Sequence, residues 1–380
     1  MKIELNAQQK KDQAAFRAFV SEEVIPHADR YDQEERIPSE LIAKLAQRGY
    51  LGATLPEEYG GCGMDMITYG LLNEELGRGC SSVRSLVTVQ NMVAQTILKW
   101  GSRHQKELWL DKMASGDAIA AFALTEPEVG SDAKNIETTA TPAGDSYIIN
   151  GHKKWITFGQ IADLFLVFGQ CEGKPCAFLI EKDTSGLSMR PIFGMLGVRA
   201  SMLAELHLND CQVSEENLVG GVGFGFVPVA LFALDLGRYG IAWGCVGIAQ
   251  ACLEACIQYT SQRKQFDVYL KEHQLIRQMI TDMIVNVKAA RLLCYQAGYS
   301  KELGDPNSFM EMLVAKYFAS TMATRVANDA VQIHGANGCS SEYALQRYLR
   351  DAKIMEIIEG TTQIHQIKIA EYGYQAYANT

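Results

Sequence analysis

The sequence predicts a mostly α-helical protein with a β-domain in its middle. Apolar residues recur at helical spacing through residues 7–118 and again after residue 225, whereas the segment between them breaks into short apolar runs separated by turn formers. A chain of 380 residues is also longer than one hydrophobic core normally supports. We therefore expect a helical domain over residues 1–118, a β-domain over 119–220 and a helical bundle over 221–380.

The first domain is predicted to consist of helices. Its opening segment places Phe16, Phe19 and Val24 on one face, and Pro26 is expected to bend or end that helix because proline disrupts a helix interior. Ser39 is the predicted N-cap of the next helix. Three further helices are expected over Tyr69–Arg78, Ser85–Gly101 and Arg103–Gly116.

The middle domain is predicted from short, strand-like segments. An Asn-Gly pair between two such runs is typical of a hairpin turn, so we expect a hairpin at Asn150-Gly151. The expected strands are Ile119–Thr125, Tyr147–Thr157, Leu164–Gly169, Ala177–Glu181, Leu187–Ile192 and Ala204–Val213.

The last domain is predicted as helices joined by glycine-containing turns. The run Gly220–Gly225 precedes it, but this run does not match G-x-G-x-x-G and lacks the βαβ setting of a dinucleotide fingerprint. We therefore interpret it as a linker. The expected helices cover residues 226–263, 270–303, 308–336, 342–356 and 362–376.

Composition and charge argue against several classes of function. The formal net charge is −9 and the basic residues are scattered, so nucleic-acid binding is not expected. The N-terminus lacks the apolar core of a signal peptide, and the longest uncharged helical stretch, Tyr239–Leu253, is too short to span a bilayer. These features predict a cytoplasmic protein. The ten cysteines form no C-x-x-C pair and are expected to be reduced thiols, with no metal site.

Three segments carry residues suited to a planar cofactor and its phosphates, although each also fits a structural role. The Thr125–Asp132 loop offers hydroxyl and backbone N–H groups, which can hold a ring edge or a phosphate, or can form only a turn. Trp155 with Thr157 suits a ring through stacking and one hydrogen bond, or plain core packing. Arg263 with Phe266 can cover a nucleotide, or can simply end a helix in solvent.

A fourth segment, Glu359–Gln363, falls between two predicted helices. Thr361 or the next residue can cap the last helix, whose N-terminus then favours an anion. Glu359 precedes a glycine, so its backbone can approach a ligand, but an acid here also complements a helix dipole. His334 lies in an apolar helix and is expected to be structural.

Taken together, the motifs and their order resemble the acyl-CoA dehydrogenase family over nearly the whole chain. No single motif is decisive, but chance agreement of so many spaced motifs is very improbable. In sequence order they are Pro56–Gly61, Thr125–Asp132, Trp155–Thr157, Arg263–Phe266, Glu272–Gln274, Gln332–Gly338, Arg350–Lys353 and Glu359–Gln363.

The resemblance implies a fold and a cofactor. The fold is an N-terminal helical domain, a middle β-barrel and a C-terminal four-helix bundle, in a homodimer or homotetramer. The cofactor is FAD, held between domains and subunits. Thr125 would bond the pyrimidine edge of the flavin and Ser131 its pyrophosphate, while Trp155 would flank the ring and Thr157 would donate to N5. The residues implied to reach the nucleotide, mostly from a neighbouring subunit, are Arg263, Phe266, Gln274, Gln332, Gly335, Thr361 and Gln363.

Glu359 matches the family's catalytic glutamate. The resemblance implies that it takes the proton from the carbon next to a thioester carbonyl while hydride leaves the β-carbon for flavin N5. Burial would have to raise its pKa for this task. Some members place the base earlier, at a position that falls within Asp235–Arg238 here, but Gly237 cannot act as a base. Arg238 is then expected beside the substrate.

Three departures from the family's common pattern lie in the proposed cofactor segments. Glu128-Val129 stands in place of Gly-Ala, Asp267 in place of a Gly after Phe, and Ala336 in place of a Gly. These changes remove no essential side chain, but they can alter FAD affinity or the subunit contact.

A finer resemblance concerns the substrate. Gly237–Tyr239, Ala242–Gly247 and Met355–Ile358 resemble members that act on acyl groups tethered to an acyl carrier protein in the biosynthesis of polyketide extender units such as hydroxymalonyl or methoxymalonyl. The expected substrate is therefore an acyl-CoA or a short oxygenated acyl group on an acyl carrier protein, with a flavoprotein as electron acceptor. Flavin oxidases and monooxygenases of the same fold remain the alternative, and a non-enzymatic helical assembly protein is the third possibility.

Overall fold

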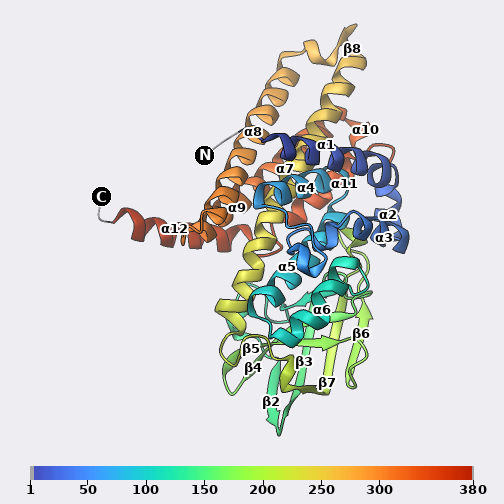
Figure 1. The fold of residues 1–380 in the computed structure, drawn as a ribbon. Helices are drawn as coiled ribbons and strands as arrows, with labels where there is room; N and C mark the ends of the chain where they lie inside the picture. Colours follow the sequence, from blue (N-terminus) through green and yellow to red (C-terminus); the bar gives the residue numbers. More distant parts are fainter. Residues whose placement is uncertain (1–3, 379–380) are drawn as a thin grey trace.

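The computed structural model describes residues 4–378 and confirms a mostly helical fold with a β-domain in the middle of the chain (Figure 1). The sheet of the β-domain lies at one end of the molecule, and the small hairpin that contains β8 lies at the other. The domain boundaries at residues 118 and 220 stay predictions.

Helices form the first part of the chain, as predicted. The opening helix is broken around Pro26, where a π-helical segment, Val20–Val24, is followed by a 3-10 turn. The N-cap prediction for Ser39 is wrong by one residue, because the extended backbone of Pro38 occupies the cap position and the helix begins at Ser39 itself. The helices are α1 Ala7–Phe19, α2 Ala28–Glu34, α3 Ser39–Gln47, α4 Met66–Gly79, α5 Ser81–Trp100 and α6 Arg103–Ser115.

The β-domain is a seven-stranded sheet in the order β1-β4-β2-β3-β7-β6, with β5 paired to β4. Its strands are β1 Ala120–Ala123, β2 Thr139–Ala143, β3 Ser146–Ile156, β4 Leu164–Cys171, β5 Lys174–Glu181, β6 Leu187–Pro191 and β7 Ala204–Ser214. The strand β2 was not predicted.

The hairpin prediction at Asn150-Gly151 is wrong. Both residues lie inside β3, at a register shift in its pairing with β7, and the hairpin turn between β2 and β3 falls at Gly144 instead. Asn150 exchanges two hydrogen bonds with Asp210 of β7, at 2.8 and 3.0 Å. Gly151 is required by close packing, since a Cβ there would lie 2.2 Å from the hydroxyl of Thr138.

The helical bundle is organised around α7 Leu231–Gln262, which packs against α4 and α5 of the first domain as well as against its own bundle. The glycines of α7 do not interrupt it. Together with the π-helical turn before it, α7 is long and apolar enough to cross a membrane, but 78% of its apolar window is buried inside the fold, so it is a core helix. The other bundle elements are β8 Lys264–Gln265, β9 Val268–Tyr269, α8 Gln274–Glu302, α9 Ser308–His334, α10 Ala336–Cys339, α11 Leu345–Met355 and α12 Thr362–Tyr377.

Candidate active site

Glu359 lies in the tight turn between α11 and α12, at the junction of these helices with α7 and α9. Its backbone is in the left-handed region, with φ 53°, and the following Gly360 has φ 102°. A residue with a Cβ prefers other regions by about 1–2 kcal/mol, so the surrounding structure has to hold this conformation. Both residues of the turn therefore have positive φ, but only Gly360 adopts it without strain.

Two cations, the partly buried Arg238 and the fully buried Lys316, hold the carbonyl oxygens of this turn. Arg238 of α7 donates through Nε to the backbone oxygen of Glu359 at 3.2 Å, and Lys316 of α9 donates to the backbone oxygen of Gly360 at 2.7 Å. Arg238 also pairs with Asp235 at 2.9 Å. The strained turn is thus fixed from two helices at once.

The carboxylate of Glu359 points at the backbone of Gly237 in α7. A Cβ built on Gly237 would lie 1.9 Å from the Oε2 atom of Glu359, so no other residue fits at position 237 while the carboxylate keeps this place. The Oε2 atom is buried and forms no hydrogen bond. A buried, unpaired carboxylate oxygen is costly, which suggests an atom held ready for a reaction partner.

Burial raises the pKa of Glu359 to about 7 from its ordinary value near 4.5. The positive charges of Arg84, Arg238 and Lys316 act in the opposite direction and keep the rise from being larger. Near neutral pH the side chain therefore exists in both its protonated and its ionised form.

Three residues around this turn were missed by the sequence analysis. Arg84 of α5 and Lys316 of α9 are fully buried, and burial lowers the pKa of Lys316 to about 8. His365 of α12 is fully buried behind the turn, with neither ring nitrogen hydrogen-bonded. Burial, followed by the charges of Lys316 and Arg238, lowers the pKa of His365 to about 3, so it is neutral. For Arg84 the available signal was a lone charged residue in an otherwise apolar segment of α5, which marks a buried charge but does not identify its neighbours, and His365 carried no such signal.

The predicted flavin-edge residues come together on the β-domain. Thr125 follows β1, and its backbone oxygen accepts a hydrogen bond from the backbone of Lys154 at 2.9 Å, which places it next to the end of β3. There Trp155, with φ 63°, leaves 45% of its side chain exposed, and the half-buried Thr157 follows it. Ser131 is exposed on the loop after Thr125.

A buried ion pair between Lys153 and Glu126 holds the Thr125–Asp132 loop against β3. Lys153 and Glu126 are both buried and lie 2.6 Å apart, and the Glu126 carboxylate also accepts from the backbone and hydroxyl of Thr138. The loop keeps a regular turn at Glu128-Val129, where the family has Gly-Ala, because the backbones of Glu126 and Val129 form two hydrogen bonds with each other.

The second group of predicted nucleotide residues lies far from Glu359 within one chain. Arg263 lies at the opposite end of α7 from Arg238, about 37 Å away at the helical rise of about 1.5 Å per residue. Phe266 is 89% exposed at the tip of the β8–β9 hairpin. Asp267, where a glycine is usual, has φ 66°, a conformation that Asp tolerates better than most residues. Gln274 begins α8 and is exposed.

Gln332 and Gly335 lie near this same end of the bundle. They flank His334, whose ring stacks on Tyr259 of α7 at 4.0 Å and whose Nδ1 lies 2.9 Å from the backbone oxygen of Ala330. At the other end, Thr361 caps α12 by accepting from Ile364 at 3.3 Å. Gln363 is exposed in the first turn of α12.

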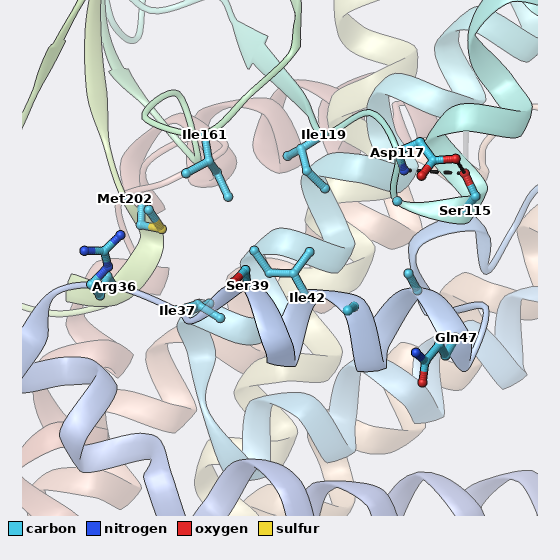
Figure 2. A pocket seen from close by; sticks show the side chains of 13 residues that line it. Arg36, Ile37, Ser39, Ile42, Gln47, Ser115, Asp117, Ile119, Ile161 and Met202 are labelled. Atoms are coloured by element: carbon cyan, nitrogen blue, oxygen red, sulfur yellow. Dashed lines mark hydrogen bonds between the residues drawn. The ribbon is translucent and has the colours of Figure 1, made fainter.

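Two other features do not belong to this site. A surface cavity of ≈ 690 Å³ opens between α3, the α6–β1 junction and the β-domain, and none of its lining residues is a predicted site residue (Figure 2). His152, Glu205 and His207 place possible metal-ligand atoms within 4.8 Å of one another among the described residues. The Nε2 atoms of His152 and His207 lie 3.4 and 3.6 Å from the same carboxylate oxygen of Glu205, and Lys154 pairs with the other oxygen at 3.1 Å, so the carboxylate already has cationic and imidazole partners.

Comparison with known proteins gives consistent results over the whole chain. Family models for the N-terminal, middle and C-terminal domains of acyl-CoA dehydrogenases match residues 6–117, 121–211 and 225–373. The chain is 39% identical to the probable acyl-CoA dehydrogenase YngJ of Bacillus subtilis, over 97% of this chain and 99% of the relative.

Solved structures also align over nearly the full length. One, described as an electron transferring flavoprotein of Acidaminococcus fermentans, has a TM-score of 0.94 and 36% identity, covering 98% of this chain and 99% of that one. A glutaryl-CoA dehydrogenase from Mycobacterium smegmatis in complex with FADH2 has a TM-score of 0.93 and 31% identity, covering 98% and 95%.

Two further structures have descriptions that name an extender unit or an acyl carrier protein. FkbI, for biosynthesis of a methoxymalonyl extender unit, has a TM-score of 0.88 and 30% identity, covering 96% of this chain and 99% of that one. The prolyl acyl carrier protein oxidase AnaB has a TM-score of 0.93 and 30% identity, covering 97% and 99%.

Proposed function

Because the chain belongs to the acyl-CoA dehydrogenase family of FAD-dependent oxidoreductases, we propose that it oxidises an acyl thioester with Glu359 as the base that removes the α-proton. The observation that carries this proposal is the buried, unpaired Oε2 of Glu359, held in a strained turn by Arg238 and Lys316. Strain and unsatisfied polar atoms of this kind are typical of functional sites.

Glu359, Arg238 and Lys316 have different roles in the proposed reaction. Glu359 accepts the α-proton, and its raised pKa makes it a stronger base than an exposed carboxylate. Arg238 and Lys316 position its turn through the two carbonyl oxygens. Burial excludes water, while the nearby cations keep enough of the ionised form present near neutral pH.

The residues on the β-domain fit FAD. Trp155 has a left-handed backbone conformation and lies near Thr125 and Thr157, and its large aromatic side chain is partly exposed. A planar ring stacked on Trp155 would bury this exposed apolar surface. We propose that these residues hold the ring and that Ser131, Thr361 and the exposed Gln363 contact its phosphates and ribose. When bound, FAD supplies the acceptor for the hydride that leaves the β-carbon.

We infer that a second copy of the chain completes the cofactor site. Arg263, Phe266, Gln274, Gln332 and Gly335 lie too far from Glu359 in one chain to share its cofactor. Apolar side chains are also exposed on the same elements and on α12, which projects from the body of the molecule (Figure 1). They include Phe266, Leu275, Val285 and Ile367. Sedimentation equilibrium tests this inference, and a monomeric holoprotein would contradict it.

The carrier of the acyl group has two candidates. The family relationship supports a coenzyme A thioester. The similarity to FkbI and AnaB, whose descriptions name an extender unit and an acyl carrier protein, supports a short oxygenated acyl group on a carrier protein in polyketide biosynthesis. An electron-transferring flavoprotein is the proposed acceptor, and cytoplasmic location remains a prediction.

A panel of thioesters tests the proposal. We expect anaerobic addition of acyl-CoA or acyl-carrier-protein substrates to bleach the flavin absorbance, because hydride leaves the substrate in a single turnover. The carrier that bleaches the flavin faster is the natural one. If no thioester on either carrier bleaches the flavin, the proposal is wrong; rapid peroxide formation in air would instead support the oxidase alternative.

The rate of flavin reduction is expected to rise with pH through about 7. Glu359 must be ionised to take a proton, and its pKa is raised to about 7, so the rate should fall about tenfold per unit below that value. In Lys316→Met a cation that lowers the pKa of Glu359 is lost, so the midpoint should move to higher pH. Stopped-flow absorbance between pH 5.5 and 9 measures both; a flat profile would contradict the assignment.

A further inference from the structure

Three side chains with metal-binding atoms lie together on the outward face of the middle sheet, and the proposed reaction uses none of them. His152 of β3 and His207 of β7 are directly opposite each other in the antiparallel pairing. Glu205 precedes His207 by two residues, so both point to the same face of β7. The intervening Lys153 and Leu206 point the other way and are fully buried. We call His152, His207 and Glu205 the His–Glu triad.

The distances within the triad match those between the ligand atoms of a metal site. The Oε2 atom of Glu205 lies 3.4 Å from Nε2 of His152 and 3.6 Å from Nε2 of His207. The possible ligand atoms of all three residues lie within 4.8 Å of one another. In a tetrahedral site with metal–ligand bonds of about 2.0–2.2 Å, neighbouring ligand atoms lie about 3.3–3.5 Å apart. Both nitrogen–oxygen distances are therefore close to the edge of such a tetrahedron.

One atom of the triad lacks a partner that its surroundings should supply. Nε2 of His152 is itself buried and forms no hydrogen bond with the residues that the structure describes. A buried nitrogen without a partner is costly, so its position points to a ligand. The two imidazole side chains as a whole are 36% and 37% exposed, so an ion can reach the triad from solvent.

The imidazole rings have to turn in order to direct both nitrogens at one ion. Their centroids are 4.1 Å apart and their planes differ by 23°, whereas a bound ion lies in the plane of each ring. The torsion that turns a histidine ring about its Cβ–Cγ bond has broad minima, so this adjustment costs little. Lys154 leaves the triad open, because it pairs with Oε1 of Glu205 at 3.1 Å and not with Oε2. Outer contacts of this kind orient a ligating carboxylate.

We propose that the His–Glu triad binds one divalent transition-metal ion of the Zn²⁺ type, which crosslinks β3 to β7. Imidazole and carboxylate donors without a thiolate suit Zn²⁺, Ni²⁺ and Cu²⁺, whereas Mg²⁺ and Ca²⁺ prefer oxygen ligands alone. The pairing of β3 with β7 shifts register on both sides of His152, and Trp155 lies near the end of β3. The ion holds the two strands together at this interruption. Solvent completes its coordination, and no step of the thioester oxidation passes through it.

Titration calorimetry of the FAD-loaded protein with ZnCl₂ tests the proposal. We expect one ion to bind per chain with a micromolar Kd. In His152→Ala and His207→Ala the Kd should rise at least about 100-fold, since even outer partners of a ligand contribute about 10–100-fold. Glu205→Gln keeps the shape of the side chain but loses its charge, so it should also weaken binding. With Cu²⁺, electron paramagnetic resonance should show two nitrogen ligands in the wild type and one in His207→Ala. MgCl₂ should give no saturable binding.

His104→Ala is the matched control, because His104 is exposed on α6 and lies outside the triad. This change should leave both the stoichiometry and the Kd for Zn²⁺ as they are in the wild type. Zn²⁺ should raise the midpoint of thermal unfolding in the wild type and in His104→Ala, but not in His207→Ala. Circular dichroism and flavin absorbance verify that each variant is folded. Absence of saturable Zn²⁺ binding, or an unchanged Kd in either variant of the triad histidines, overturns the proposal and leaves the proposed thioester oxidation untouched.

Discussion

Glu359→Gln is expected to lower kcat/KM for thioester oxidation by about 10⁴-fold while the protein stays folded and yellow. The amide has nearly the same shape as the carboxylate, so it keeps the packing against Gly237 but cannot accept the α-proton. General-base catalysis typically contributes about 10²–10⁴-fold to the rate. The carboxylate of Glu359 is the acid that lies against Gly237 in the structure. Steady-state oxidation of the best thioester with an artificial electron acceptor measures the change.

The control for this variant is the bound flavin itself. The flavin absorbance spectrum and the far-UV circular dichroism of Glu359→Gln should match those of the wild type, because the turn is held through backbone oxygens that the substitution leaves in place. Loss of flavin together with activity would mean that Glu359 has a structural role. Activity within tenfold of the wild type would contradict its role as the base.

Gly237→Ala is expected to lower kcat/KM by about 100-fold. The new Cβ would lie 1.9 Å from the Oε2 of Glu359, and α7 is a packed core helix, so the carboxylate must move. A displacement of about 1 Å of a catalytic group can cost about 10²-fold. Combining Gly237→Ala with Glu359→Asp, whose carboxylate is one methylene shorter, should recover part of the loss relative to the sum of the two single changes.

Gly373→Ala serves as the matched control. Gly373 is also helical, but nothing lies within 4 Å of a Cβ built there, so this change should leave kcat/KM unchanged. Flavin content should be normal in both variants. A wild-type rate in Gly237→Ala would show that the carboxylate does not need the place that the structure gives it.

Periodicity was enough to predict which parts of the chain are helical, because the helices bury apolar faces at regular spacing. It was not enough where tertiary contacts decide the local conformation. Asn150-Gly151 is a common turn pair, yet here Asn150 bonds across to Asp210 and Gly151 packs on Thr138 within a continuous strand. The glycines of α7 likewise do not break the helix, since they allow α4 and α5 to approach it closely.

The candidate site was predictable to the extent that it lies in short motifs. Glu359 and Gly237 could be singled out by motif and position, but only the fold shows that they face each other across two elements. The strain in the turn was also hidden, because it is imposed by Arg238 and Lys316 from other helices. Arg238 was predicted to contact the substrate, which stays a prediction, whereas in the structure it holds the turn and Asp235.

Arg84 could not have been identified as part of the site from the sequence alone. A single arginine in an apolar helix has no periodic or motif signal that names its neighbours. Arg84 donates to Thr88 and Ser85 on its own helix and to Met355, which lies 271 residues further along the chain. Its side chain also occupies space that a Cβ at Gly244 would fill. Such a cluster is defined only once α5, α7 and α11 have packed together.

The most direct test of the central claim isolates proton transfer from oxidation. Holoenzyme whose flavin has been reduced beforehand cannot take a hydride, but Glu359 can still exchange the α-proton of a bound thioester with solvent. Incubation in deuterium oxide followed by mass spectrometry of the thioester measures this exchange. Our account predicts deuterium at the α-carbon with the wild type and an exchange rate at least about 100-fold lower with Glu359→Gln. Equal rates of exchange in the two proteins would contradict it.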